Sequence, residues 1–542
     1  MPVVDVMTVV ELLRHQARRI PDRRSHVFLD SGGQESATLT FGELDRRAKA
    51  VAARLGDLVP PGACAVLSYP PSLEFLPAFF GCLYAGVVAV PAPATRRTHG
   101  DARLERLAAI IADARPDCVL STSHHLAGRY LADRALATDL VDPTEADRWT
   151  PTPVAPDTTA YLQYTSGTTK APKGVVLTHD NVLGNLSLIT DHDTRAGERR
   201  EAPTVTWLPL FHDMGLIGGV LRPLYLGHTS VLMAPHVFAR SPITWLEALD
   251  RYRAEIAAAP SLGYDLCVRR VTEAQRDGLD LSRLRIAVIS DEPLRPETID
   301  AFARHFAPSG FRRDAFLPSY GLAESTVLVS GGPLDGEPLV TAFDADALAL
   351  GRVRTAEPGA RVRRLVACGA PEPSLTVVVT DPDGRPTDDV GEIRVSGPSV
   401  GLGYWRRPAE SNATFQSTVD GHPGERFLRT GNLGFLHDGL LHVLCRTEDL
   451  ITVEGHLHLP YDLEEAVVAA DPAIRAACAF TDPEGRVVVL AETRDDVSVT
   501  VPGVDLVVPV RPGTLRHTTS GKLRRADSRA AWLSAREERT GR

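Results

Sequence analysis

Hydrophobic and polar positions in the first half of the chain follow two alternating patterns. Two amphipathic stretches open with a capping-box pair, Thr8 with Glu11 and Thr40 with Glu43, and apolar residues at helical spacing follow each pair. Short apolar runs without polar alternation lie between such stretches, at residues 65–67, 118–120, 230–233 and 286–289. Runs of this kind are typical of parallel strands covered on both faces, so the pattern predicts a layered α/β fold.

Residues 75–95 carry no charge, and their length alone would allow a membrane-spanning helix. Prolines and glycines interrupt this stretch, and residues 87–90 have the composition of a buried strand. A helix, a glycine turn and a core strand in succession produce the same apolar run. We therefore predict these three elements and no membrane span.

The pattern becomes richer in strands after about residue 374. Strands are predicted at residues 375–380, 392–396 and 426–430, with a hairpin over 435–444. Asp438-Gly439 has the composition of the hairpin turn. These elements indicate a β-rich subdomain over about 375–448.

The last part of the chain mixes helix and strand patterns. A helix at 463–470 and strands at 487–491 and 506–510 predict a small α+β domain. We therefore divide the chain into an N-terminal domain, residues 1–448, and a C-terminal domain, residues 449–542.

Composition changes this picture little. A chain of 542 residues exceeds one hydrophobic core, which supports at least two domains. The net charge of −10 argues against non-specific binding of nucleic acid, which needs a basic surface. Seven cysteines without a CxxC pair predict reduced thiols and a cytoplasmic location. The first eleven residues lack the pattern of a signal peptide.

The most specific polar feature is the segment YTSGTTKAPKG at residues 164–174. Hydroxyl and backbone N–H groups in such a segment donate to phosphate oxygens, and Gly167 lets the backbone come close. The segment is not a Walker A loop, because the GxxxxGK[ST] spacing is absent. A polar surface turn rich in serine and threonine is the alternative.

Four further segments accompany this loop: YGLAE at 320–324, TGN at 430–432, RTED at 446–449 and TSGK at 519–522. Their order along the chain resembles that of the adenylate-forming superfamily, which includes acyl-CoA synthetases, peptide-synthetase adenylation domains and luciferases. The resemblance covers nearly the whole chain. It implies the adenylate-forming enzyme fold, with a small mobile C-terminal domain, and the use of ATP and Mg²⁺.

The chemistry of that superfamily gives these segments roles. A carboxylate attacks the α-phosphorus of ATP, and Mg²⁺ and a lysine offset the repulsion between the two anions. The resemblance implies Lys522 as the adenylation lysine, Glu324 as the Mg²⁺ ligand and Asp449 as the hinge residue. The nucleotide-binding set that it implies is Thr165, Ser166, Gly167, Thr168, Thr169, Lys173, Asp291, Ser319, Tyr320, Gly321, Leu322, Ala323, Asn432 and Arg446.

Three features indicate one group within this superfamily: residues 208–218, residues 264–270, and Lys170, where other members keep glycine. They are similar to the fatty acyl-AMP ligases, which transfer the acyl group from acyl-AMP to the phosphopantetheine arm of an acyl carrier protein. Residues 340–371 resemble the insertion that, in this group, restricts the domain rotation needed for CoA thioester formation. A variable surface loop is the alternative for this stretch.

His212 has two interpretations. As a catalytic and substrate-binding residue, beside Met214 and Gly215, it would lie at the carboxylate end of an acyl pocket. It could equally be a core histidine in a segment rich in glycine and leucine. The spacing of Met214, Leu216 and Ile217 slightly favours core positions over an acyl tunnel.

Three features depart from the family pattern. Asn432 replaces the usual aspartate at the ribose, which removes charge assistance from hydrogen bonds to hydroxyl groups. Asp291 adds a charged side chain beside the adenine, and Glu448 stands where a lysine is usual. Residues 492–507 leave little room for the usual helix and favour a polar turn.

These observations leave three functions in competition. An acyl-AMP ligase that serves a carrier protein is favoured. An acyl-CoA synthetase is the first alternative, and a family member that binds nucleotide or acyl chains without catalysis is the second. A peptide-synthetase adenylation domain is disfavoured, because the segment around 211–215 lacks the acidic residue that would hold an amino group.

Overall fold

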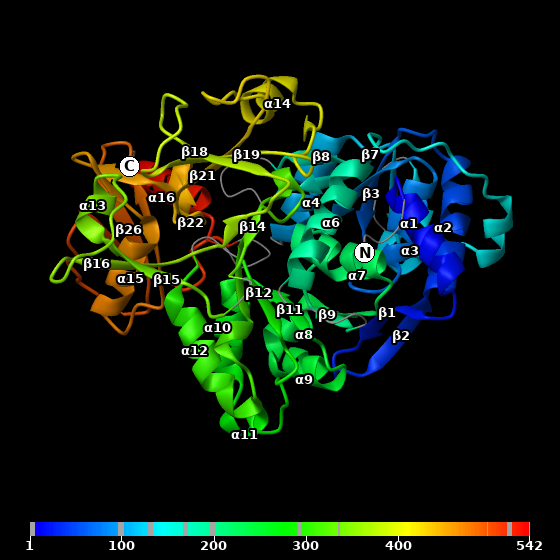
Figure 1. Cartoon of the computed structure of the whole chain (residues 1–542), viewed down its shortest axis with the longest axis horizontal. Coiled ribbons are helices and arrows are strands. Elements are labelled where there is room, and N and C mark those ends of the chain that lie inside the picture. The colour runs from blue at the N-terminus through cyan, green and yellow to red at the C-terminus, as the bar shows by residue number, and fades with distance from the viewer. Residues whose placement is uncertain are drawn as a thin grey trace.

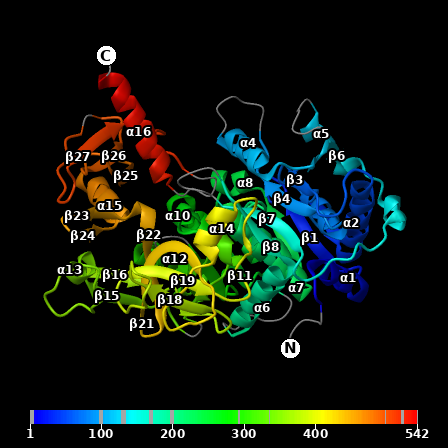
Figure 2. The same ribbon diagram turned by 90° about the horizontal axis from the view of Figure 1, so that it is seen from above.

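The computed structural model describes residues 6–95, 102–127, 134–165, 172–195, 202–290, 294–333, 336–495, 497–517 and 523–540. Two large sheets form the body, a small antiparallel sheet adjoins them, and the C-terminal residues form a separate sheet (Figures 1 and 2). The N-terminal helices and the C-terminal segment lie at opposite ends of the long axis. The layered α/β fold predicted from the sequence is confirmed.

The first large sheet has seven strands, in the order β20 (Gly403–Tyr404), β8 (Gly174–Thr178), β7 (Thr159–Tyr164), β4 (Val88–Ala92), β3 (Cys64–Ser68), β5 (Cys118–Ser121) and β6 (Ala135–Ala137). The strands from β7 to β6 are parallel. β8 and β20 continue the sheet in antiparallel pairing.

The second large sheet has nine strands, in the order β17 (Ala370–Pro371), β14 (Ser330–Gly331), β13 (Phe316–Tyr320), β12 (Ile286–Ile289), β11 (Ile256–Ala259), β9 (Thr204–Thr206), β10 (Ser230–Met233), β1 (Arg24–Leu29) and β2 (Glu35–Thr40). Its strands from β13 to β1 are parallel. The four apolar runs found in the sequence are β3, β5, β10 and β12, and each pairs in parallel as predicted.

Helices surround these sheets. They include α1 (Val9–Arg19), α2 (Phe41–Gly56), α3 (Phe75–Tyr84), α4 (Ala102–Ala114), α5 (Ser123–Leu126), α6 (His179–Arg195), α7 (Arg222–Leu226), α8 (Pro235–Arg240), α9 (Ile243–Arg251), α10 (Ser261–Arg270), α11 (Glu273–Arg276), α12 (Pro296–Phe306) and α14 (Pro408–Phe415). One hydrophobic core joins both sheets, and it contains Leu12 of α1, Phe79 of α3, Leu67 of β3 and Leu232 of β10.

The caps of the first two helices differ in detail. Thr40 and Glu43 form the complete capping box at α2. Thr8 caps α1 by accepting the N–H of Glu11, but the Glu11 carboxylate accepts from Met7 instead of Thr8. The second hydrogen bond of the first predicted capping box is therefore wrong, because Glu11 bonds the N–H of the residue before Thr8.

The uncharged stretch at 75–95 folds as predicted into α3, a turn and β4. Gly86 occupies the turn with a φ of +67°, a left-handed conformation that glycine adopts without strain. Among the described residues, no helix has the length and apolarity to cross a membrane.

The β-rich part is a four-stranded antiparallel sheet of β18 (Thr376–Thr380), β19 (Gly391–Ser396), β21 (Leu428–His437) and β22 (Leu440–Arg446). Asp438 and Gly439 form the hairpin turn with φ values of +50° and +75°, as their composition predicts. The strand predicted at 426–430 begins at Leu428 and extends beyond Thr430, because β21 continues to His437 as the first strand of the hairpin and pairs Asn432 with Arg446.

Residues 340–371 are not an irregular loop. β15 (Val340–Asp344) and β16 (Val362–Val366) form an antiparallel pair, and α13 (Ala345–Ala349) follows β15. Phe343, Leu348 and Leu365 pack into one hydrophobic cluster with Phe435 of β21 and Tyr461 of the C-terminal segment.

The C-terminal segment contains β23 (Ile451–Val453), β24 (His456–His458), α15 (Pro460–Ala470), β25 (Ala476–Thr481), β26 (Val487–Glu492), β27 (Leu506–Val510) and α16 (Arg525–Thr540). β25, β26 and β27 form a sheet with its own hydrophobic core. The described residues between β26 and β27 contain no helix, in agreement with the polar turn predicted there.

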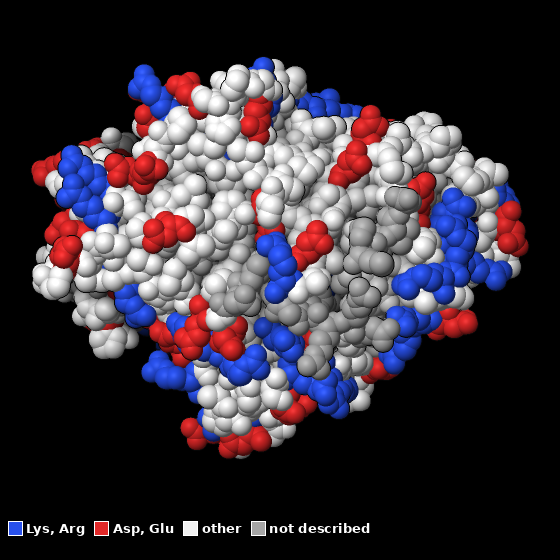
Figure 3. Space-filling view, in the orientation of Figure 1, with Lys and Arg blue, Asp and Glu red and all other residues white. Residues whose placement is uncertain are grey.

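Charges of both signs are interspersed on the face that Figure 3 shows, and red and blue side chains adjoin over α12. Arg313 lies 3.0 Å from Asp300, and Arg364 of β16 lies 3.7 Å from the same carboxylate. These ion pairs connect β16 to α12 on the surface.

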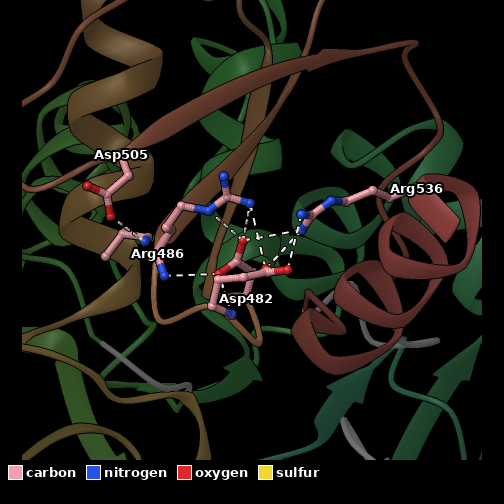
Figure 4. Close-up of polar contacts among 6 residues, drawn as sticks. Asp482, Arg486, Asp505 and Arg536 are labelled. Carbon is pink, nitrogen blue, oxygen red and sulfur yellow. Dashed lines mark hydrogen bonds and ion pairs between the residues drawn. The ribbon is translucent and has the colours of Figure 1, made fainter. Parts of the chain in front are cut away.

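Asp482 organises the turn between β25 and β26 and its contact with α16 (Figure 4). Its buried carboxylate accepts the N–H groups of Glu484 and Arg486 at 3.1 and 2.9 Å, and the Arg486 guanidinium at 2.7 and 2.9 Å. Arg536 of α16 lies 3.6 Å from the same carboxylate and donates to Glu484 at 2.9 and 3.1 Å.

We predict that Asp482→Ala weakens the C-terminal sheet and the docking of α16. The change leaves two backbone N–H groups and two arginines without their shared acceptor, which costs about 2–3 kcal/mol. Hydrogen exchange over β25, β26 and α16 measures the local opening free energy. Asp383→Ala, which removes an exposed carboxylate 3.0 Å from Arg385, is the control and changes stability little. Equal protection in both variants would contradict the prediction.

Candidate active site

The two large sheets meet at one short turn that follows β13. The turn runs from Gly321 through the 3₁₀ helix η6 (Ala323–Ser325). The N–H of Gly401 donates to the carbonyl of Glu324 at 2.9 Å, and Tyr404 of β20 donates to its carboxylate at 2.9 Å. Loops at the carboxyl ends of parallel strands are the usual location of ligand sites in α/β sheets. This meeting point is the candidate site.

The Glu324 carboxylate is electrostatically perturbed. Loss of hydration raises its pKa above the ordinary glutamate value, while the Tyr404 hydrogen bond and the charge of Arg446 act in the opposite direction. The negative charge of Asp213 adds to the increase. A partly desolvated carboxylate near a second acid is suited to a bound cation.

Gly321 is required by the close approach of two backbone segments. A Cβ atom at this position would lie 1.5 Å from the carbonyl oxygen of Val327. Thr326 closes the turn with a φ of +64°, which is rare for a β-branched residue, and its hydroxyl donates to Ser399 at 2.8 Å. Leu322 and Ala323 lie within this turn, and Ser319 is buried on β13 with its hydroxyl bonded to Leu317.

Tyr320, Asn432 and Arg446 come together although they are far apart in sequence. Asn432 is buried on β21, and its amide donates to the Tyr320 hydroxyl at 2.7 Å. Arg446 of β22 is the register partner of Asn432, and its charge acts on Glu324. The structure thus gathers three residues of the predicted nucleotide set, together with Glu324, around the end of β13.

The two described ends of the phosphate loop pair with each other. The N–H of Thr165 donates to the carbonyl of Lys173 at 3.1 Å. Arg106 of α4 donates to the carbonyl of Thr165 at 3.2 Å. Burial, with repulsion from Arg524, lowers the pKa of Arg106 to about 10, so residue 524 is near the loop. Ser166, Gly167, Thr168, Thr169, Lys170, Asp291 and Lys522 lie outside the described residues.

His212 precedes Asp213, whose charge acts on Glu324, and it is not a fully buried core residue. Its Nδ1 atom is 2.7 Å from Asp213, and its side chain is 23% exposed. The preceding carbonyl, of Phe211, accepts from Gln163 of β7 at 3.0 Å, which holds this turn against the strand before the phosphate loop.

The residues after His212 begin the π-helix η3 (Met214–Leu221). Met214 is partly exposed, whereas Leu216 and Ile217 are buried in the main core, as their spacing favoured. A Cβ atom on Gly215 would lie 2.1 Å from the carbonyl of Pro209, so this position requires glycine.

Asp449 ends the 3₁₀ helix η7 (Thr447–Asp449), between β22 and the C-terminal segment. Its carboxylate accepts from Arg525 of α16 at 3.3 Å, and the same guanidinium contacts Glu464 of α15 at 2.8 Å. Burial raises the pKa of Asp449, and Arg525 partly compensates. The predicted hinge residue is therefore tied to the segment that follows it.

Three site residues were missed in the sequence: Tyr404, Arg106 and Asp213. Asp213 is adjacent to His212, and its electrostatic effect on Glu324 appears only in three dimensions. Tyr404 lies 80 positions from Glu324, and Arg106 lies 59 positions from Thr165. No local pattern signals contacts of such separation.

Comparison with known proteins places this site in a family. The chain belongs to the AMP-binding enzyme family, whose model matches residues 13–405. Within this family, the resemblance to fatty acyl-AMP ligases that the sequence motifs indicated is confirmed by the relatives. The medium-chain fatty acid–acyl-carrier-protein ligase JamA of Moorena producens is 36% identical, over 97% of this chain and 95% of its own length. The 4-hydroxyphenylalkanoate adenylyltransferase of Mycobacterium tuberculosis is 35% identical, over 97% and 92%.

Solved structures give the same result. The fatty acid AMP ligase of Legionella pneumophila is 33% identical, with a TM-score of 0.79 over 98% of this chain and 96% of that chain. A structure from work on fatty acyl-adenylate ligases of E. coli and L. pneumophila is 30% identical, with a TM-score of 0.88 over 98% and 99%. The adenylate-forming fold expected from the sequence motifs is confirmed.

We predict that Gly321→Ala disrupts the turn that carries Glu324. The added methyl group meets a backbone carbonyl, which cannot move as a side chain would, so the cost is about 3 kcal/mol or more. Thermal unfolding and equilibrium ATP binding measure the loss. Gly184→Ala is the matched control, because its Cβ would be 3.7 Å from Pro398 within helix α6. That variant gains about 0.5–1 kcal/mol. Equal stability of the two variants would contradict the clash.

Proposed function

We propose that this protein activates a fatty or related carboxylic acid with ATP. The acid's carboxylate attacks the α-phosphorus, the bond to the β-phosphate breaks, and acyl-AMP and pyrophosphate form. The thiol of a phosphopantetheine arm on an acyl carrier protein then attacks the acyl carbon and AMP leaves. The observation that carries this proposal is the convergence of Tyr320, Glu324, Asn432 and Arg446 beside the phosphate loop.

Each residue of the site is assigned one part of the reaction. We assign adenine contact to Tyr320, ribose contact to Asn432 and phosphate contact to residues 165–169 and Lys173. We assign charge neutralisation on the transferring phosphoryl group to Lys522. Arg524, two positions later in the sequence, acts electrostatically on Arg106 at the phosphate loop, which supports this assignment. His212 and Met214, with Gly215, contact the acid at the edge of the site.

Magnesium fits the residues present. Among the described residues no group of three His, Cys, Asp or Glu side chains forms a metal cage. Mg²⁺ in phosphoryl-transfer sites takes one or two carboxylates and completes its shell with phosphates and water. Glu324 supplies one such carboxylate, and the bound ion would neutralise charge on the phosphates.

The acceptor is inferred from the position of residues 340–371. Arg363 donates to Asp462 and Tyr461 of α15 and lies 4.9 Å from the Tyr461 ring centroid. Arg295 of the large domain lies 3.0 Å from Glu465. These contacts restrain the C-terminal segment, which supports a carrier protein over CoA as acceptor. The seven free, buried cysteines support a cytoplasmic location.

An acid-panel assay tests the proposal. The purified chain with Mg²⁺·ATP should release pyrophosphate with fatty acids and load a holo-acyl carrier protein, with the apo carrier as control. Some relatives are named putative fatty-acid–CoA ligases, so CoA is assayed in parallel. Thioester formation on CoA at a matching rate would favour a CoA synthetase. Absence of turnover with every acid would favour a non-catalytic binder.

We predict that Lys522→Ala abolishes acid-dependent ATP–pyrophosphate exchange while ATP binding is largely retained. The lysine acts on charge that develops in the transition state, so its loss lowers kcat more than affinity. Lys49→Ala is the control, because that lysine pairs with Asp45 on α2. Exchange at the wild-type rate in Lys522→Ala would show that another residue performs this role.

We predict that Asn432→Asp lowers the KM for ATP by about three- to tenfold. A carboxylate accepts ribose hydroxyls in charge-assisted hydrogen bonds, which are roughly twice as strong as neutral ones. Steady-state kinetics at saturating acid gives the KM. Asn412→Asp makes the same charge change on an exposed residue of α14 and leaves KM unchanged. An unchanged or higher KM in Asn432→Asp would contradict the ribose assignment.

A further inference from the structure

Tyr404 connects the edge of the seven-stranded sheet to the Glu324 carboxylate. Its hydroxyl donates to Oε1 of Glu324 at 2.9 Å, and its side chain is almost fully buried. Its ring contacts Phe415 of α14 edge-on, with centroids 5.1 Å apart. The hydroxyl therefore holds one of the two carboxylate oxygens in a fixed direction.

A cation also lies over the ring of Tyr404. The Nζ atom of Lys173 lies 4.7 Å from the ring centroid and 2.7 Å from the carboxylate of Glu410. A lysine over an aromatic face is attracted by the ring's negative quadrupole. Lys173 is the last polar residue of the phosphate loop, so the loop and the Glu324 carboxylate share Tyr404 as a neighbour.

A second set of contacts supports the same assembly. Arg407 donates to Glu410 at 2.8 Å and lies 2.5 Å from Asp113 of α4. Tyr164, the first residue of the phosphate loop segment, donates to Asp113 at 2.8 Å. Both ends of the phosphate loop thus belong to one polar network, and Lys173 connects that network to the ring of Tyr404.

Lysine is rare in this chain, and Lys173 is one of few examples. The sequence uses arginine for nearly every positive charge and contains only four lysines, Lys49, Lys170, Lys173 and Lys522. Two of them lie in the phosphate loop and one in the C-terminal motif. The lysine ammonium is a compact point charge on a flexible stem, so it can contact the ring face and a phosphate.

We propose that Tyr404 is a positioning residue that orients the Glu324 carboxylate toward the metal ion of Mg²⁺·ATP. Through Lys173, Tyr404 also links the orientation of this carboxylate to the phosphate loop. The proposal rests on the proposed adenylation function. Hydrogen bonds to a metal-ligating carboxylate fix its orientation, and their loss typically reduces metal affinity by about 10- to 100-fold. A tyrosine that only filled space would leave this affinity unchanged.

Tyr404→Phe tests the proposal because it removes the hydroxyl and keeps the ring beneath Lys173. The matched control is Tyr84→Phe. The Tyr84 hydroxyl donates to the Asp45 carboxylate at 2.7 Å, and this carboxylate also pairs with a lysine, Lys49. Tyr84 lies in the core, away from the site. Melting temperatures of both variants report any general loss of packing.

The first readout is equilibrium binding of Mn²⁺ to the ATP complex without acid, followed by electron paramagnetic resonance. We expect about tenfold or weaker Mn²⁺ affinity in Tyr404→Phe and wild-type affinity in Tyr84→Phe. The second readout is the exchange assay, where the KM for Mg²⁺ rises while kcat at saturating Mg²⁺ stays within about threefold. In a Glu324→Gln background, Tyr404→Phe should weaken Mn²⁺ binding no further.

The outcomes separate the two proposals. Wild-type Mn²⁺ affinity and KM for Mg²⁺ in Tyr404→Phe overturn the role of Tyr404, whatever the acid specificity. Equal losses in Tyr404→Phe and Tyr84→Phe also overturn it, because they indicate a packing effect. Normal Mn²⁺·ATP binding without exchange in the wild-type chain overturns the adenylation function alone. A wild-type chain that binds no Mn²⁺·ATP overturns both.

Discussion

The candidate site depends on one junction, the turn after β13 that reaches from the nine-stranded sheet to the edge of the seven-stranded sheet. Gly401 and Tyr404 bond the backbone and side chain of Glu324, and Thr326 bonds Ser399. The turn tolerates no side chain at Gly321. The shared hydrophobic core fixes the separation of the two sheets, because close-packed interiors resist deformation. Packing far from the site therefore sets the position of its carboxylate.

The second constraint is electrostatic. A chain of net charge −10 has to bring together two anions, ATP and a carboxylate. The cations available at the site come from separate elements: Arg106 from α4, Lys173 from the loop and Arg446 from β22. Arg106 keeps its charge despite burial, because a pKa of about 10 still lies above neutral pH. Elsewhere, acidic and basic side chains pair on the surface, as they do around Asp300.

Two arginines attach the first half of α15 to other parts of the chain. Arg363 holds the start of α15 through Asp462 and Tyr461, and Arg525 joins Glu464 to Asp449. Arg363 belongs to residues 340–371, whereas Arg525 belongs to the segment itself. Rotation about Asp449 would thus have to break the first set of contacts and could preserve the second. The contacts of Arg363 are therefore the ones that connect residues 340–371 to α15.

The sequence predicted elements whose signals are local and left open those that depend on distant contacts. Unalternating apolar runs located β3, β5, β10 and β12, because burial on both faces demands such runs. Asp438-Gly439 located a turn for which few residues have the required φ values. The strand end expected at residue 430 was wrong, because β21 continues through residues 430–432, which bulge relative to β19 while Asn432 pairs with Arg446 of β22.

The same distinction applies to the site. Ordered motifs indicated Tyr320, Glu324, Asn432 and Arg446 because each motif is a short contiguous segment. Tyr404 lies in no such motif, and its partner Glu324 is 80 residues away, on the turn that follows β13 of the other large sheet. A residue that orients a metal-ligating carboxylate without contacting the metal is identified only by the atom that its hydroxyl bonds. In this chain, that information is in the packing of two sheets and not in any stretch of sequence.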